Sequence, residues 1–327
     1  MRHFLSERLW GKVEVTEPVI GEILATRAMQ RLKGVDQAGY YEPYMPGTAH
    51  SRFEHSVGVY YLLRRFGAPL DEQVSGLIHD VSHAVFSHCI DYAGRGGSES
   101  RQDWQDRAHG AYVLSSDIAP VLRRHGFSIR KILDDRRHPL KERKLPDLCA
   151  DRLDYSLRSA FMYRIIPAAA AFEFLDRLVI RDQNWVFTSG RAALSYARLF
   201  LKLNRKFYSG LASAVMFRTV GDAVSAGLGE GIITDADLFR TDSVVLAKLR
   251  AAKDSGIMRL LRRMDRLTPV KRVRSGGNAA VTVKSRVVDP LYLYRGRIRR
   301  LSDGRPDYVR IIRREMKPKF YRFLFRD

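Results

Sequence analysis

The stretch from Gly76 to Tyr92, GLIHDVSHAVFSHCIDY, places three histidines and two aspartates among apolar side chains. On a helix, the adjacent residues His79 and Asp80 diverge by about 100°, so one metal ion can reach both only over that edge of the helix. His83 lies one turn after His79 and therefore on the same face. Neutral imidazole and carboxylate are ligands that divalent transition metals prefer. The crowding predicts a metal site on a helix, although a lone histidine in an apolar helix is usually a core residue.

Two further segments supply imidazole and carboxylate groups. Ser51 and Glu54 form an S-x-x-E capping box, which places a helix start at Ser51 and His55 in the second turn. Asp151 and Asp154 lie three residues apart on an expected helix and so on one side of it. One carboxylate should close the metal site and the other should orient it, because ligating groups usually need such support. A core histidine and a surface carboxylate are the structural alternatives.

The motifs QRLKGVDQAGYY, PGTAHSRFEHS, HDVSHAVFSH and DRLDY, within residues 30 to 208, resemble those of the HD-domain metal-dependent phosphohydrolases. The similarity is closest to the dNTP (dGTP) triphosphohydrolase branch. This resemblance implies a mainly α-helical, HD-type bundle in which His55, His79, Asp80 and Asp151 hold one divalent metal ion. The mixed ligands favour Mn, Fe, Co, Ni or Zn over Mg, which prefers sites made of oxygen alone.

The resemblance also implies roles for residues around the metal. It nominates His109, paired with Asp91, as the general acid, and His83 is the second choice; Gly110 follows His109 where the relatives commonly have Glu. The expected substrate contacts are Arg52, Arg152 and His88 for phosphate, Gln37 for the 3′-hydroxyl, and Tyr155 and Tyr208 for the deoxyribose. The arginines suit phosphate because a planar guanidinium can bond two oxygens. Surface arginines and core tyrosines are the alternatives.

Two positions depart from the vertebrate relatives. Ser159 stands where they place an Asp against the sugar hydroxyl, and Gly210 stands where they have a His after the tyrosine that matches Tyr208. The metal chemistry therefore looks intact, whereas the sugar and base pocket looks altered.

The positive charge is concentrated at the C-terminus. From Thr241 onward there are 24 Lys and Arg against 8 Asp and Glu, a net charge of +16 out of +21 for the whole chain. Such a basic part favours single-stranded nucleic acid or another polyanion as a partner, unless it is only a solvated face. The chain lacks an apolar signal segment and any membrane-spanning run, so we expect a soluble, cytoplasmic protein without a membrane partner. Cys89 and Cys149 are expected to be buried, unreactive thiols.

The pattern along the chain predicts a mainly α fold with a small β-containing part (α+β). We expect an HD-type helical domain over residues 1–255, with an HD core at about 50–160, and a basic α+β subdomain over 256–327. Helices are expected over 16–33, 190–215 and 245–264, and a loop over 34–48. A hairpin is expected around 182–184, and short strands in VTVKSRVV, LYLYRGRI and DYVRII.

The leading hypothesis is a metal-dependent nucleotide phosphohydrolase that releases triphosphate from a dNTP. The first alternative is an HD hydrolase of another phosphoester, such as a nucleoside monophosphate, a cyclic nucleotide or single-stranded nucleic acid. The second is a nucleic-acid-binding protein with a structural metal site. The sequence leaves the preferred base, the native metal, an allosteric nucleotide and the oligomeric state open, and a homo-oligomer is compatible with it.

Overall fold

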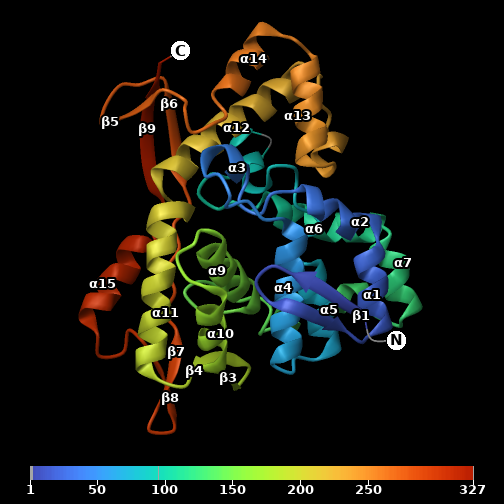
Figure 1. Ribbon diagram of the computed structural model, residues 1–327, viewed down its shortest axis with the longest axis vertical. Helices are drawn as coiled ribbons and strands as arrows, with labels where there is room; N and C mark the ends of the chain where they lie inside the picture. Colours follow the sequence, from blue (N-terminus) through green and yellow to red (C-terminus); the bar gives the residue numbers. More distant parts are fainter. Residues whose placement is uncertain (1–2, 95, 327) are drawn as a thin grey trace.

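The computed structural model describes residues 3–94 and 96–326, and its architecture is mainly helical, as expected. Three helices form the centre of the HD region (Figure 1): α4 (Arg52–Arg65), α5 (Leu70–Ile78) and α9 (Ala150–Met162). Helix α4 packs against both α5 and α9. The apolar residues of their contact faces are fully buried, among them Val59 and Leu62 of α4, Leu77 of α5 and Leu153 of α9. Burial of this apolar area fixes the three helices relative to one another.

The start of α4 is determined locally. The Ser51 side chain accepts a hydrogen bond from the Glu54 backbone N–H, and the Glu54 carboxylate accepts one from the Ser51 backbone N–H at 2.8 Å. Each side chain satisfies a backbone N–H that has no partner within the helix. The predicted capping box is thus confirmed, and it places His55 in the second turn, where its side chain is fully buried.

The other helices surround this centre. On the N-terminal side they are α1 (Pro18–Ala25), α2 (Arg27–Arg31), α3 (Tyr41–Tyr44), α6 (Trp104–Ser115), α7 (Ile118–Arg124) and α8 (Ile129–Ile132). On the C-terminal side they are α10 (Ala168–Asp176), α11 (Gly190–Leu203), α12 (Leu211–Gly229), α13 (Asp242–Ala251), α14 (Ser255–Arg262) and α15 (Pro306–Glu315). Two shorter helical segments matter for the site: the 3₁₀-helix η2 (Ser87–Tyr92) and the π-helix η4 (Asn204–Tyr208).

Three small sheets complete the described fold. An N-terminal hairpin pairs β1 (His3–Glu7) with β2 (Gly11–Val15). A four-stranded sheet has the order β3-β4-β7-β8, formed by β3 (Leu178–Arg181), β4 (Asn184–Phe187), β7 (Leu291–Tyr294) and β8 (Arg297–Arg300). A three-stranded sheet has the order β5-β9-β6, formed by β5 (Val270–Val273), β9 (Lys319–Phe325) and β6 (Ala279–Val283). In Figure 1 the latter two sheets lie at opposite ends of the molecule, one below α11 and the other beside α12.

The C-terminal part is joined closely to the preceding residues. Strand β7 pairs in parallel with β4, with Val186 opposite Leu291, so one sheet contains strands from both sides of residue 255. Strand β6 packs against α12, and Val281, Val283 and Phe323 belong to the same buried cluster as Ala214 and Val220. The division at residue 255 stays a prediction, and the core is continuous across it.

Several expectations for individual elements are wrong. The helix expected to carry His79 to His83 ends at Ile78, and a turn follows it. The expected single helix over 16–33 is broken at Thr26, which caps α2 by accepting a hydrogen bond from the Met29 N–H. The expected loop over 34–48 contains α3, and the DYVRII run belongs to helix α15, because its apolar residues Tyr308, Ile311 and Ile312 recur at helical spacing.

The predicted hairpin around residues 182–184 is confirmed as β3-β4. Asp182 and Gln183 have φ values of 49° and 57°, as two-residue hairpin turns require. Cys89 and Cys149 are both buried and free, and burial raises the pKa of each thiol. Within residues 3–94 and 96–326, no helix combines the length and the apolar character needed to cross a bilayer. Cytoplasmic location and nucleic-acid binding stay predictions.

Candidate metal centre and its surroundings

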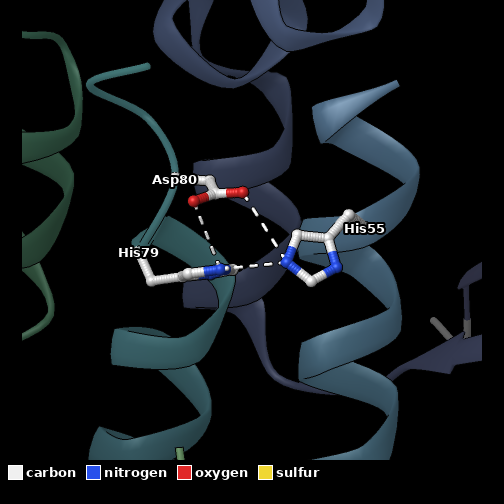
Figure 2. Close-up of side chains that lie close together, drawn as sticks. All are labelled: His55, His79 and Asp80. Carbon is white, nitrogen blue, oxygen red and sulfur yellow. Dashed lines mark hydrogen bonds and ion pairs between the residues drawn. The ribbon is translucent and has the colours of Figure 1, made fainter. Parts of the chain in front are cut away.

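Four of the side chains predicted as ligands converge on one point. His55 projects from α4, and His79 and Asp80 project from the turn at the end of α5 (Figure 2). Asp151 lies in the first turn of α9. Nε2 of His55 lies 3.2 Å from Nε2 of His79 and 2.9 Å from Oδ1 of Asp151. The Asp80 carboxylate lies 3.4 Å from Nε2 of His79 and 3.6 Å from Nε2 of His55. Ligand atoms of His55, His79 and Asp80 lie close enough together to hold one ion.

Hydrogen bonds on the far side of each imidazole fix its tautomer. Nδ1 of His79 lies 2.7 Å from the Gly76 carbonyl oxygen, which can only accept, so this nitrogen carries the proton. Nδ1 of His55 lies 2.8 Å from Oδ2 of Asp154 and donates to it. Both Nε2 lone pairs therefore face the centre of the cluster, as metal ligands require. Two imidazole nitrogens and two carboxylates fit a divalent transition-metal ion.

The charges of the cluster are strongly coupled. Burial lowers the pKa of His55, but hydrogen bonds with Asp151 and Asp154 outweigh this effect and raise it to about 9. Burial raises the pKa of Asp80, but the neighbouring Arg52 guanidinium holds it well below its usual range. Burial likewise raises the pKa of Asp151, but its hydrogen bonds with His55 and His79 hold that pKa well below its usual range. The carboxylates thus stabilise positive charge beside the two imidazoles. A bound metal cation would supply this charge in place of the protons on the imidazoles.

Asp154 is the centre of a buried network behind His55. Besides the bond from His55, it accepts a hydrogen bond from Nε1 of Trp10 at 2.6 Å and two from Arg158 at 2.9 and 3.0 Å. Arg158 is fully buried and forms a second ion pair with Glu7 in the N-terminal hairpin. The predicted orienting carboxylate is therefore brought to His55. Trp10 and Glu7 carry no motif and could not be linked to the site from the sequence.

Both arginines predicted to contact phosphate donate to protein groups. Arg52 donates to Asp80 at 2.7 Å, to the Ser87 hydroxyl at 2.9 Å and to the Gln37 carbonyl oxygen at 2.7 Å. Arg52 therefore holds a metal ligand in place. Arg152 donates to the backbone of Asp147 and Arg143 and to Sγ of Cys149, so it closes the loop before α9. Glu142 and Cys149 also lie beside Asp151, and the nearby Arg152 side chain supplies positive charge there.

The structure pairs the candidate acids differently from the prediction. Asp91 lies beside His88, with its Oδ2 3.6 Å from Nδ1, and neither atom has another partner in the described chain. His109 instead lies 3.2 Å from the Ser82 hydroxyl through Nδ1. His83 contacts Asp80 at 3.3 Å. Burial lowers the pKa of His83 to about 3 and that of His109 to about 4, so both are neutral in the absence of a bound anion.

An unusual loop carries His88 into the site. Phe86 and Ser87 both have left-handed backbone conformations, with φ values of 54° and 45°. Such conformations are rare for residues with side chains and need support from their surroundings. Asp242 supplies it, because its carboxylate accepts the Phe86 N–H at 2.7 Å and the Asp36 N–H at 2.9 Å. Asp242 thereby ties the loop of His88 to the loop of Gln37, a role that no sequence pattern indicates.

The residues predicted to contact the sugar come from three separate segments: Gln37 precedes α4, Tyr155 lies on α9 and Tyr208 ends η4. The rings of Tyr155 and Tyr208 meet edge to face with centroids 5.6 Å apart. Ser159 is buried, and it lies near the Tyr163 and Tyr208 side chains. Oε1 of Gln37 is buried without a partner in the described chain. Buried polar atoms rarely lack partners, so the Gln37 oxygen and the His88 and Asp91 pair are candidates for contact with a polar ligand.

Two cations near His88 and Asp91 come from the basic C-terminal part. Lys284 follows β6 directly and is half-buried, and Arg286 lies two residues further on. Burial lowers the pKa of His88 well below its usual range, and the charges of Arg52, Arg286 and Lys284 lower it further. The sequence analysis missed both residues, because they lie more than a hundred residues beyond the HD motifs and belong to a run of many cations.

The comparisons with known proteins agree with this geometry. Residues 52–158 match the family model "HD domain". The chain is 33% identical to the protein YdhJ of Bacillus subtilis over 79% of this chain and 78% of that protein. It is 30% identical to the metal-dependent phosphohydrolase cns2 of Cordyceps militaris over 80% of this chain and 77% of that protein.

A shorter match, at 36% identity, covers 27% of this chain and 17% of the deoxynucleoside triphosphate triphosphohydrolase SAMHD1 of Bos taurus. Among solved structures, a phosphohydrolase from Bacteroides thetaiotaomicron shares the fold over the whole of both chains, with a TM-score of 0.71 and 16% identity. The matches to YdhJ and cns2 thus include most of this chain, whereas the match to SAMHD1 includes about a quarter of it.

Proposed function

Because the chain belongs to the HD-domain family of metal-dependent phosphohydrolases, we propose that it hydrolyses a phosphoester bond of a nucleotide, and that a dNTP is its substrate. The observation that carries this proposal is the convergence of His55, His79, Asp80 and Asp151. The partial match to the triphosphohydrolase SAMHD1 supports the dNTP as substrate.

His55, His79, Asp80 and Asp151 would hold the metal ion, whose chemistry is to lower the pKa of a bound water and to polarise a phosphoryl oxygen. The surrounding protein groups orient these four ligands. Asp154 and the Gly76 carbonyl oxygen hold the two imidazoles, and Arg52 holds the Asp80 carboxylate. These supports prevent the ligands from turning away, and such outer contacts usually matter almost as much as the ligands.

The leaving oxygen of the nucleoside needs a proton. We assign this role to His88, because Asp91 lies beside it and can orient the imidazole through Nδ1. Positive charge from Arg52 disfavours protonation of free His88, whereas an anionic phosphate beside the ring would favour it. The proton would then be available only when substrate is bound. His109, held at Ser82, and His83, held at Asp80, remain candidates for contacts to phosphate oxygens.

Tyr155 and Tyr208 would contact the sugar ring, and Gln37 would bond its 3′-hydroxyl through the unpartnered Oε1. Ser159 is neutral, so it would hold a sugar less firmly than a carboxylate does. This favours a second candidate function, hydrolysis of another phosphoester such as a nucleoside monophosphate. The long matches to YdhJ and cns2, which include most of this chain, leave that substrate open.

A product screen on metal-loaded protein tests the proposal. The panel is dNTPs, matched NTPs, nucleoside monophosphates, cyclic dinucleotides and oligonucleotides. We expect triphosphate and nucleoside from a dNTP, and a loss of both bound metal and turnover in Asp80→Ala. The control is Asp176→Ala, which removes an exposed carboxylate that pairs with Arg65. Stoichiometric metal and full turnover in Asp80→Ala would refute the site, and hydrolysis of monophosphates alone would replace the dNTP with the second candidate.

A further inference from the structure

The substrate's phosphate oxygens need cations that are free to bind them. Arg52 and Arg152, which the sequence nominates, donate to Asp80, Ser87 and to backbone and thiol groups of the loop before α9. Lys284 differs from them. In the described part of the chain its ammonium group forms no hydrogen bond or ion pair, although the side chain is half-buried. A partly buried ammonium group without a hydrogen bond or ion pair to the protein is available to bind an anion from solution.

The segment that carries Lys284 is held in a fixed position. Asn204 donates to the Ser285 hydroxyl at 3.0 Å and accepts the Arg286 backbone N–H at 2.8 Å. The Arg286 side chain donates to Gln102 at 2.8 Å, and Gln102 in turn donates to the Tyr92 hydroxyl at 3.1 Å. The segment 284–286 is therefore pinned to η4, which ends with Tyr208, and to η2, which carries His88 and Asp91.

The packing of these elements makes the segment a wall of the site. Strand β6, which precedes Lys284, packs against α12, and η2 packs against the same helix. Lys284 is close enough to feel the charges of Asp91, Asp106, Arg152 and Arg286. Burial, assisted by Arg286, lowers the pKa of Lys284 to about 8, so it is still charged at neutral pH. Lys284 therefore lies near Asp91, which is next to the proposed acid His88. It also lies near Arg152, which follows the metal ligand Asp151 in the chain.

We propose that Lys284, held in place through Arg286, binds the terminal phosphates of the substrate, so that the C-terminal part of the chain selects nucleotides with more than one phosphate. This inference rests on the proposed function for the identity of the substrate. It gives two of the cations of the basic C-terminal part a role at the site rather than at a nucleic-acid surface.

The test separates phosphate binding from catalysis. We compare wild type with Lys284→Met, and with Lys284→Arg, which keeps the charge. The matched control is Lys319→Met, because Lys319 pairs with Val283 in the neighbouring strand and its nearest carboxylate is Glu315. Binding of inorganic tripolyphosphate and of monophosphate is measured by calorimetry at constant ionic strength. KM and kcat are measured for a dNTP and for the corresponding monophosphate, and unfolding midpoints verify that each variant is folded.

We expect Lys284→Met to weaken tripolyphosphate binding at least tenfold and to raise KM for the dNTP by a similar factor. Changes in kcat and in monophosphate KM should stay within about threefold, and Lys319→Met should resemble wild type. Between pH 7 and pH 9, wild type should lose tripolyphosphate affinity as Lys284 deprotonates, whereas Lys284→Arg should keep it. Unchanged tripolyphosphate binding in folded Lys284→Met would overturn the inference.

The proposed function can fail separately from this inference. If wild type cleaves no nucleotide while Lys284→Met still loses tripolyphosphate binding, the anion site stands and the dNTP assignment falls. If wild type cleaves dNTPs and Lys284→Met has an unchanged KM for them, the dNTP assignment stands and the role of Lys284 falls.

Discussion

Replacing Gly58 by alanine is expected to damage both the stability and the metal site of this protein. Gly58 lies on α4, three residues after His55, and faces α9. A Cβ atom there would lie 1.9 Å from Oδ1 of Asp154 and 2.4 Å from a terminal nitrogen of Arg158. Both partners are fully buried and bonded to each other, so neither can move into open space. The Asp154 carboxylate must shift, and its bond to His55 must lengthen.

The expected magnitude follows from three contributions. A helical Gly→Ala change alone stabilises by about 1 kcal/mol. Overpacking a filled core costs about 1–3 kcal/mol. Weakening a buried hydrogen bond to a charged group costs about 1.5–3 kcal/mol. The net destabilisation is therefore about 1.5–5 kcal/mol, accompanied by a metal affinity that falls roughly 10–100-fold, as for other losses of outer support.

Guanidinium unfolding and metal competition measure the two effects. Gly21→Ala in α1 is the matched control, because a Cβ at Gly21 meets nothing within 4 Å. The control should gain up to about 1 kcal/mol and keep its metal affinity. If Gly58→Ala gained stability as the control does and bound metal as tightly as wild type, the packing of Asp154 against α4 would be refuted.

Two further predictions concern the supports of His55. Asp154→Asn should lower metal affinity about 10–100-fold in a competition assay, since it removes the charge that holds His55 and Arg158, while the exposed Asp176→Asn should change it less than twofold. Glu54→Gln should cost about 1 kcal/mol in unfolding experiments at pH 7. Burial raises the pKa of Glu54, but its bonds with Arg8 and Ser51 outweigh burial and lower the pKa from 4.5 to about 2. The ionised Glu54 side chain therefore stabilises the fold fully above pH 4.5, and this stabilisation is lost as the pH falls towards 2. A difference between Glu54→Gln and wild type that persists at pH 2 would contradict this.

The sequence by itself determined the residues of the metal cluster and the local structure of two of its supports. The capping box at Ser51 and Glu54 fixes the start of α4, because it depends on groups only three residues apart. The spacing of Asp151 and Asp154 places both on one side of α9, and the helix confirms it. The order of the motifs identified the family, since their residues have to meet around one ion.

Only the tertiary structure decided how the remaining groups meet. His79 and Asp80 lie on the turn after α5, because the metal cluster and not helical periodicity sets their direction. Asp91 lies beside His88 since the strained backbone at Phe86, held by Asp242, turns η2 into the site. Lys284 reaches the site because β6 packs on the helix that also supports η2. These contacts join residues far apart in the chain, and a local pattern of side chains carries no record of which distant surfaces pack together.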